Sequence, residues 1–150
     1  MYTTIVVGTD GSETATQAVT RAAALAARDL ATLLIVSAYR PVDQSRLEAE
    51  RAEMPDDLAH VVSPTEDVDS ILVEAADLAR RCGAAKVESL AVHAQAADAL
   101  LDVAEKSGAD LIVVGSQGME GARRFLLGSV PNRISHHAPC DVLIVKTGQA

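Results

Sequence analysis

Short apolar runs alternate along this chain with segments that have helical character, and this alternation limits the possible folds more than any other feature. The first run, TTIVVGT, is β-branched and apolar, and the segment after it is rich in Ala, with apolar residues at three- and four-residue steps. Continued along the chain, the pattern predicts strands at 3–9, 31–39, 86–93, 110–115 and 141–146, and helices at 12–29, 63–83, 98–108 and about 129–137.

Strands that read as solid apolar runs, with helices between them, are typical of a parallel sheet that is covered on both faces. Right-handed crossovers leave few topologies for such a chain, and the doubly wound one is the natural choice. We therefore expect one Rossmann-like α/β domain over residues 1–150. Sheets of this kind bind ligands at the carboxyl ends of their strands, near the point where the strand order reverses.

Two of the predicted helices have clear ends. Ser63 and Glu66 have the spacing of a capping box, Pro64 stands at the first helical position, and Gly83 can close the same helix. Gly108 closes the next one in the same way.

Composition excludes several classes of partner. The net charge is −8, which repels phosphate backbones and anionic lipids, so we expect neither nucleic acid nor a membrane as a partner.

The start, MYTTIVVGTDGS, lacks the features of a signal peptide, and no apolar run is long enough to span a bilayer. The expected location is the cytoplasm. Cys82 and Cys140 do not form a disulfide framework.

Residues 40–63 are the least orderly part of the chain. The stretch from Asp43 to Asp77 holds eleven acidic residues and only two bases, Arg46 and Arg51. One interpretation is a variable, solvated acidic insertion. The other is a lid over the ligand or a docking surface for a partner.

The stretch GSQGMEGARRFLLGS, residues 115–129, gathers four of the nine glycines directly after a predicted strand. Glycines allow backbone angles that expose successive N–H groups, and the helix that begins at about Ser129 offers N–H groups without internal partners. N–H groups of both kinds, with a hydroxyl, form an anion cradle. Spacing alone is equally compatible with a tight turn that has no ligand.

These residues also carry a resemblance. GSQG, nine residues and then GS match the G-x2-G-x9-G-(S/T) signature of the universal stress protein family in its nucleotide-binding branch. The flanks LIVVGS and HAPCDVLIVK agree with it, and IVVGTDGSETATQAV resembles the family's opening strand and helix. The likeness runs over nearly the whole chain, with 40–63 as the part that varies within the family.

The resemblance implies an architecture and a partner. It implies five parallel strands in the order 3-2-1-4-5 with helices on both faces, and a homodimer that pairs through the last strand, Asp141 to Lys146. An apolar edge strand such as DVLIVK is a liability unless it is covered or paired.

The resemblance further implies an adenine nucleotide, ATP with or without Mg²⁺, as ligand. Asp10 matches the position that holds the ribose hydroxyls; from its place alone, it could also cap the following helix, and both roles could hold. Thr9 and Ala38 match positions around the adenine, with Ala38 smaller than the valine expected there, and Val114 lies below the base. The full set of nucleotide-binding residues is Gly8, Thr9, Asp10, Ala38, Val114, Gly115, Gly118, Gly128, Ser129 and Val130.

The sequence gives no sign of dedicated catalysis. There is no P-loop lysine, no evident base beside the glycine-rich stretch and no carboxylate pair placed for magnesium. His136 and His137 read as ordinary helix-end residues rather than metal ligands. The main hypothesis is a nucleotide-binding regulatory module of the stress response. The alternatives are a cyclic AMP sensor or buffer, a slow ATPase, and a nucleotide-free interaction protein.

Overall fold

The computed structural model describes residues 1–39, 64–116 and 129–147. Its strands form one parallel sheet in the order β3-β2-β1-β4-β5, as expected. They are β1 (Thr4–Gly8), β2 (Thr32–Tyr39), β3 (Lys86–His93), β4 (Leu111–Gly115) and β5 (Asp141–Val145).

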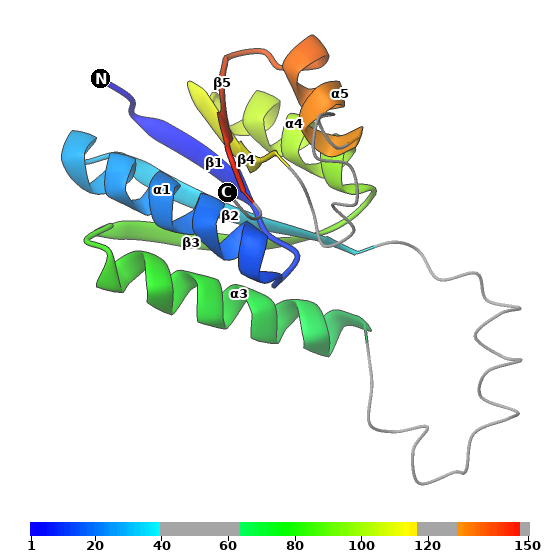
Figure 1. Cartoon of the computed structure of the whole chain (residues 1–150), viewed down its shortest axis with the longest axis horizontal. Helices are drawn as coiled ribbons and strands as arrows, with labels where there is room; N and C mark the ends of the chain where they lie inside the picture. The colour runs from blue at the N-terminus through cyan, green and yellow to red at the C-terminus, as the bar shows by residue number, and fades with distance from the viewer. Residues whose placement is uncertain (40–63, 117–128, 148–150) are drawn as a thin grey trace, which may run out of the picture.

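Four helices of the described residues cover the two faces of this sheet: α1 (Glu13–Asp29), α3 (Pro64–Arg81), α4 (Ala96–Ser107) and α5 (Ser129–His137). Figure 1 shows α1 and α3 on one face and α4 and α5 on the other. Alternate residues of the strands supply the two cores. Ile5 and Val7 of β1 pack toward α1 and α3, whereas Val6 packs toward α4 and α5.

The ends of the helices agree with the sequence in most places and differ in two. Pro64 begins α3, and Gly108 ends α4 in the left-handed conformation with φ +68°. However, α4 begins at Ala96, two residues before the predicted start. At the end of α1, Leu30 adopts the left-handed conformation with φ 56°, although no glycine marks this turn. Ser63, the first half of the predicted capping box, lies outside the described residues.

The loop between β1 and α1 packs tightly against α3. Gly11 has φ +81°, and a Cβ at this position would lie 2.8 Å from Cγ1 of Ile71. Both the backbone angle and the lack of space therefore require glycine here. This contact places the loop that carries Asp10 against α3.

Gly108 provides a matched control for Gly11, since its φ is also positive and a Cβ there would meet nothing within 4 Å. We expect Gly108→Ala to lower the free energy of unfolding by about 1–2 kcal/mol, the penalty for a left-handed side chain. Gly11→Ala pays the same penalty and about 1–3 kcal/mol more for overpacking against Ile71. Urea unfolding of the two variants tests this difference, and equal losses would contradict the packing of the loop on α3.

Candidate functional site

The carboxyl ends of all five strands meet at one edge of the sheet, and the order of strands reverses between β1 and β4. The chain passes from β1 to β2 on one side, and β4 lies directly on the other side, with Val7 paired to Val113. Gly8 ends β1 and Gly115 ends β4, so both residues open onto this switch point. In doubly wound sheets, this place is where ligands bind. It is the candidate site.

Three hydrogen bonds fix the loop that follows β1. The Thr9 N–H donates to the carbonyl of Val36 over 2.9 Å, which extends the pairing with β2 by one residue. The Gly11 N–H donates to Oγ1 of Thr9 over 3.1 Å. The Ser12 N–H donates to Oδ1 of Asp10 over 2.9 Å. Thr9 is buried and Asp10 is exposed, so the loop holds a carboxylate rigidly at the edge of the sheet.

Ser12, and not Asp10, caps α1. The Ala15 N–H donates to Oγ of Ser12 over 3.1 Å, and Ser12 has the extended backbone of a cap residue. The capping interpretation of Asp10 is therefore wrong in its simple form. Asp10 supports the cap residue through one oxygen, while its Oδ2 has no hydrogen-bond partner within the described part of the chain.

An apolar cluster lies at the carboxyl ends of β2 and β4 on the α4–α5 face. Val114 is 4% exposed, and Ala38 and Val130 are half-buried members of the same cluster. Gly8 lies on this face too, since a Cβ there would lie 2.9 Å from Cδ1 of Leu100. The structure thus brings together four of the predicted residues that come from β1, β2, β4 and α5.

The amino end of α5 is the third component of the site. Ser129 is its first residue and is exposed. An ion pair of 2.7 Å between Arg133 of α5 and Asp98 of α4 joins the two helices. The N–H groups of the first turn have no partner within the helix, and the helix dipole favours an anion there. The predicted phosphate residues Gly118 and Gly128 lie outside the described residues.

Ser116, which directly follows the predicted Gly115, was missed by the sequence analysis. Its N–H donates to the carbonyl of Val145 over 2.8 Å, and its Oγ accepts a 3.0 Å bond from the Thr147 N–H. In the signature Ser116 is only one of the variable positions, so no sequence signal marked it.

A stacked ring pair was also missed. Tyr39 and His93 end β2 and β3, and their ring centroids lie 5.0 Å apart. Tyr39 and His93 are paired in the register of β2 and β3, and only the observed alignment of the strands shows this pairing.

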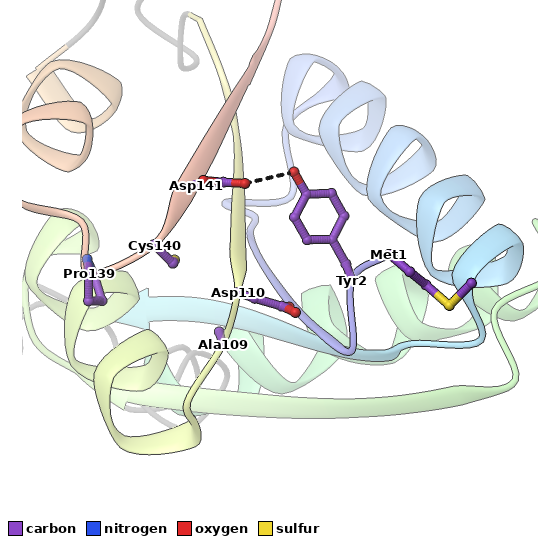
Figure 2. A pocket seen from close by; sticks show the side chains of 7 residues that line it. All are labelled: Met1, Tyr2, Ala109, Asp110, Pro139, Cys140 and Asp141. Carbon is purple, nitrogen blue, oxygen red and sulfur yellow. Dashed lines mark hydrogen bonds between the residues drawn. The ribbon is translucent and has the colours of Figure 1, made fainter.

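A hollow of about 620 Å³ lies at the opposite, amino edge of the sheet (Figure 2). Its carboxylates serve the fold: Asp110 accepts hydrogen bonds from the N–H groups of Thr3 and Thr4, and Asp141 accepts one from the Tyr2 hydroxyl. Burial acts to raise the pKa of Asp110, but these N–H groups hold it below its ordinary value. Two carboxylates at this edge repel a phosphate, so this hollow is a poor anion site.

Burial, together with the charges of Asp141 and Asp110, raises the pKa of the Cys140 thiol in the same hollow. A thiol of this kind is less nucleophilic than an ordinary cysteine. Cys82 and Cys140 are both free cysteines, as the sequence indicated.

The free energy of unfolding distinguishes the role of the Ser12 hydroxyl from that of the Asp10 carboxylate. Ser12→Ala removes the cap of α1 and should lower the free energy of unfolding by about 1 kcal/mol. Asp10→Ala removes the acceptor of one exposed hydrogen bond, that from the Ser12 N–H, and should lower it by only about 0.5 kcal/mol. Denaturant unfolding at neutral pH measures both. A loss in Asp10→Ala as large as that in Ser12→Ala would make Asp10 a structural residue.

The strand order and the helices on both faces define the class of doubly wound α/β domains. Comparison with known proteins narrows this class. The sequence model of the universal stress protein family matches residues 1–146. The chain belongs to the universal stress protein family.

Individual relatives agree with this assignment. The chain is 42% identical to the universal stress protein Rv1636 of Mycobacterium tuberculosis over 146 residues, and this alignment covers 97% of each chain. It is similar to a universal stress protein whose crystal structure was solved in complex with cAMP, with 37% identity, a TM-score of 0.75 and 98% of each chain covered. The structure of an Archaeoglobus fulgidus universal stress protein in complex with dAMP has 23% identity and a TM-score of 0.69, with 97% and 98% of the two chains covered, and supports the fold alone.

No helix within residues 1–39, 64–116 and 129–147 has the length and apolar character needed to cross a membrane.

Proposed function

We propose that this protein binds an adenine nucleotide, ATP in the first place, at the carboxyl edge of the sheet between β1 and β4. Its role would be that of a regulatory module in the stress response, as in the nucleotide-binding branch of its family. The observation that supports the proposal is that Asp10 follows β1, that Ala38 and Val114 lie at the carboxyl ends of β2 and β4 in one apolar cluster, and that α5 begins at Ser129, after β4.

Each part of the site suits one part of the nucleotide. Oδ2 of Asp10, which has no hydrogen-bond partner within residues 1–39, 64–116 and 129–147, can accept hydrogen bonds from ribose hydroxyls without loss of the Oδ1 bond to Ser12. Adenine suits the surface of Ala38 and Val114, where Ala38 leaves more room than a larger aliphatic residue would. The phosphates suit the first turn of α5, with the hydroxyl of Ser129 and the N–H of Val130 as donors.

The glycines complete this assignment. Gly8 and Gly115 end the two strands that flank the switch point, and Gly118 and Gly128 are assigned to the phosphates from the sequence signature. The Ser116 N–H does not serve as a phosphate donor in this arrangement, because it is bonded to Val145.

Cyclic AMP is the second candidate ligand, and one specific observation favours it. A relative with 37% identity over 98% of this chain was crystallised with cAMP. Both ligands need the same adenine and ribose contacts, so the phosphate contacts decide between them. Slow hydrolysis of ATP is an additional property to be measured.

The proposal includes a homodimer that forms through β5. Val142, Leu143 and Ile144 are half-buried on this strand, and its outer edge has no partner strand among the described residues. Pairing with a second copy would cover an edge that is otherwise prone to aggregation.

Calorimetric titration of nucleotide-stripped protein with Mg-ATP and, separately, cAMP tests the ligand. We expect ATP to bind, and Asp10→Ala to weaken binding by about 1–3 kcal/mol because the ribose contact is lost. Glu105→Ala is the matched control, since it removes one exposed carboxylate from α4 and should leave the affinity unchanged. Tighter binding of cAMP than of ATP would assign the site to a cyclic nucleotide, and no binding of either would refute the proposal.

Gly118→Val tests the phosphate contacts. The added side chain would block the approach of a phosphate to the backbone, so binding of ATP should fall below detection. Thermal unfolding of the variant monitors the fold, which should remain. ATP affinity equal to that of the wild type would contradict the role given to the glycines.

A further inference from the structure

The ion pair between Arg133 and Asp98 lies between the amino ends of two helices. Asp98 stands in the first turn of α4, which begins three residues after the carboxyl end of β3 at His93. Arg133 follows the first residue of α5 by about one turn. Because α5 ends shortly before β5 starts at the amino edge, its amino end points to the carboxyl edge as well. The pair is therefore close to the first turn of α5, where the phosphates are proposed to bind.

Arg133 shares one face of α5 with Ser129. The two residues are four positions apart, which puts their side chains on the same side of a helix, and both are exposed, whereas Pro131 and Ile134 are buried. Four residues of helix span about 6 Å, and helical side chains lean back toward the amino end. The long side chain of Arg133 can thus reach the first turn. This relation is set by α5 itself, from Ser129 to Arg133.

Asp98 occupies only part of the Arg133 guanidinium. The contact joins Nη2 of Arg133 to Oδ1 of Asp98. A guanidinium carries five N–H donors in a planar fork that matches the oxygens of a phosphate. One carboxylate oxygen does not saturate this fork, so Arg133 retains the capacity to bind an anion.

The ion pair is also weak enough to be exchanged. The side chains of Arg133 and Asp98 keep 56% and 48% of their surfaces exposed. Exposed ion pairs of this kind contribute little free energy, because solvent screens them. A phosphate chain carries more negative charge than one carboxylate, and it binds a guanidinium through charge-assisted, bidentate hydrogen bonds. A polyphosphate at the amino end of α5 would therefore take the guanidinium from Asp98.

We infer that Arg133 is a specificity-determining residue of the proposed site, which contacts the outer phosphates of ATP, and that Asp98 is the counter-ion it leaves when ATP binds. The inference rests on the proposed function, because it names a further contact of the same site. Adenosine has no phosphate for Arg133, and cAMP offers a single phosphate that is closed onto its ribose. Arg133 thus favours ATP over both.

Calorimetric titration of variants with ATP, cAMP and adenosine tests this role. Arg133→Gln should weaken ATP by about tenfold, the effect of one lost hydrogen bond between charged groups, and adenosine by less than about twofold. The loss for cAMP should be smaller than that for ATP. Asp98→Asn removes the competing counter-ion and one negative charge, so it should strengthen ATP by about threefold. The two variants thus act in opposite directions.

The ion pair of Asp102 and Lys106 within α4 provides matched controls. These side chains are 3.1 Å apart, carry the same charges and are exposed, but they lie farther along α4 toward the amino edge. Lys106→Gln and Asp102→Asn change the net charge as the test variants do. Both should leave the affinity for ATP within about twofold of the wild type.

Wild-type affinity for ATP in Arg133→Gln would overturn the inference. Weaker ATP binding in both Arg133→Gln and Asp98→Asn would also overturn it, since this is the result for an ion pair that only joins α5 to α4. Equal losses in Arg133→Gln and Lys106→Gln would do the same, because they report net charge alone. If the wild type bound neither ATP nor cAMP, the proposed function would fail and the inference with it, an outcome distinct from ATP binding that the variants leave unchanged.

Discussion

The burial of β1 on both faces and its pairing on both edges is the constraint on which the rest of the structure depends. Ile5, Val6 and Val7 are fully buried, and hydrogen bonds join β1 to β2 on one side and to β4 on the other. A parallel strand in this place forces all carboxyl ends to one edge. The loop after Gly8 therefore opens where the strand order reverses, and helices on both faces leave that edge as the place for a ligand.

Charge separates the two edges of the sheet. At the amino edge, Asp29, Asp110 and Asp141 accept hydrogen bonds from the first residues of the chain, so acidic groups stabilise the start of β1. Arg28 and the Tyr2 N–H lower the pKa of Asp29 to about 2, so this carboxylate stays ionised at an acidity that protonates an ordinary aspartate. At the carboxyl edge, the amino end of α5 provides partial positive charge. A chain with net charge −8 can thus still offer an anion site.

Periodicity predicted the order and type of the described elements because the solid apolar runs of β1, β2 and β4 leave few alternatives. It missed the left-handed Leu30, since that turn follows from how α1 must meet β2 and not from a glycine. For the site, the resemblance supplied the candidate residues. Only the hydrogen bonds showed that Ser12 caps α1 and that Asp10 bonds to the N–H of Ser12. Ser116 was missed because its partner Thr147 is 31 residues away.

The most direct test of the central claim is to map where ATP binds by two-dimensional ¹⁵N NMR titration of the assigned protein. The account predicts that amide shifts cluster at the carboxyl edge, at Gly8 to Asp10, Ala38, Gly115 and Ser129 to Val130. The amides at the amino edge, such as Tyr2, Asp110 and Asp141, should not move. Shifts that cluster at the amino edge, or that spread evenly over the sheet, would contradict an ATP site at the switch point.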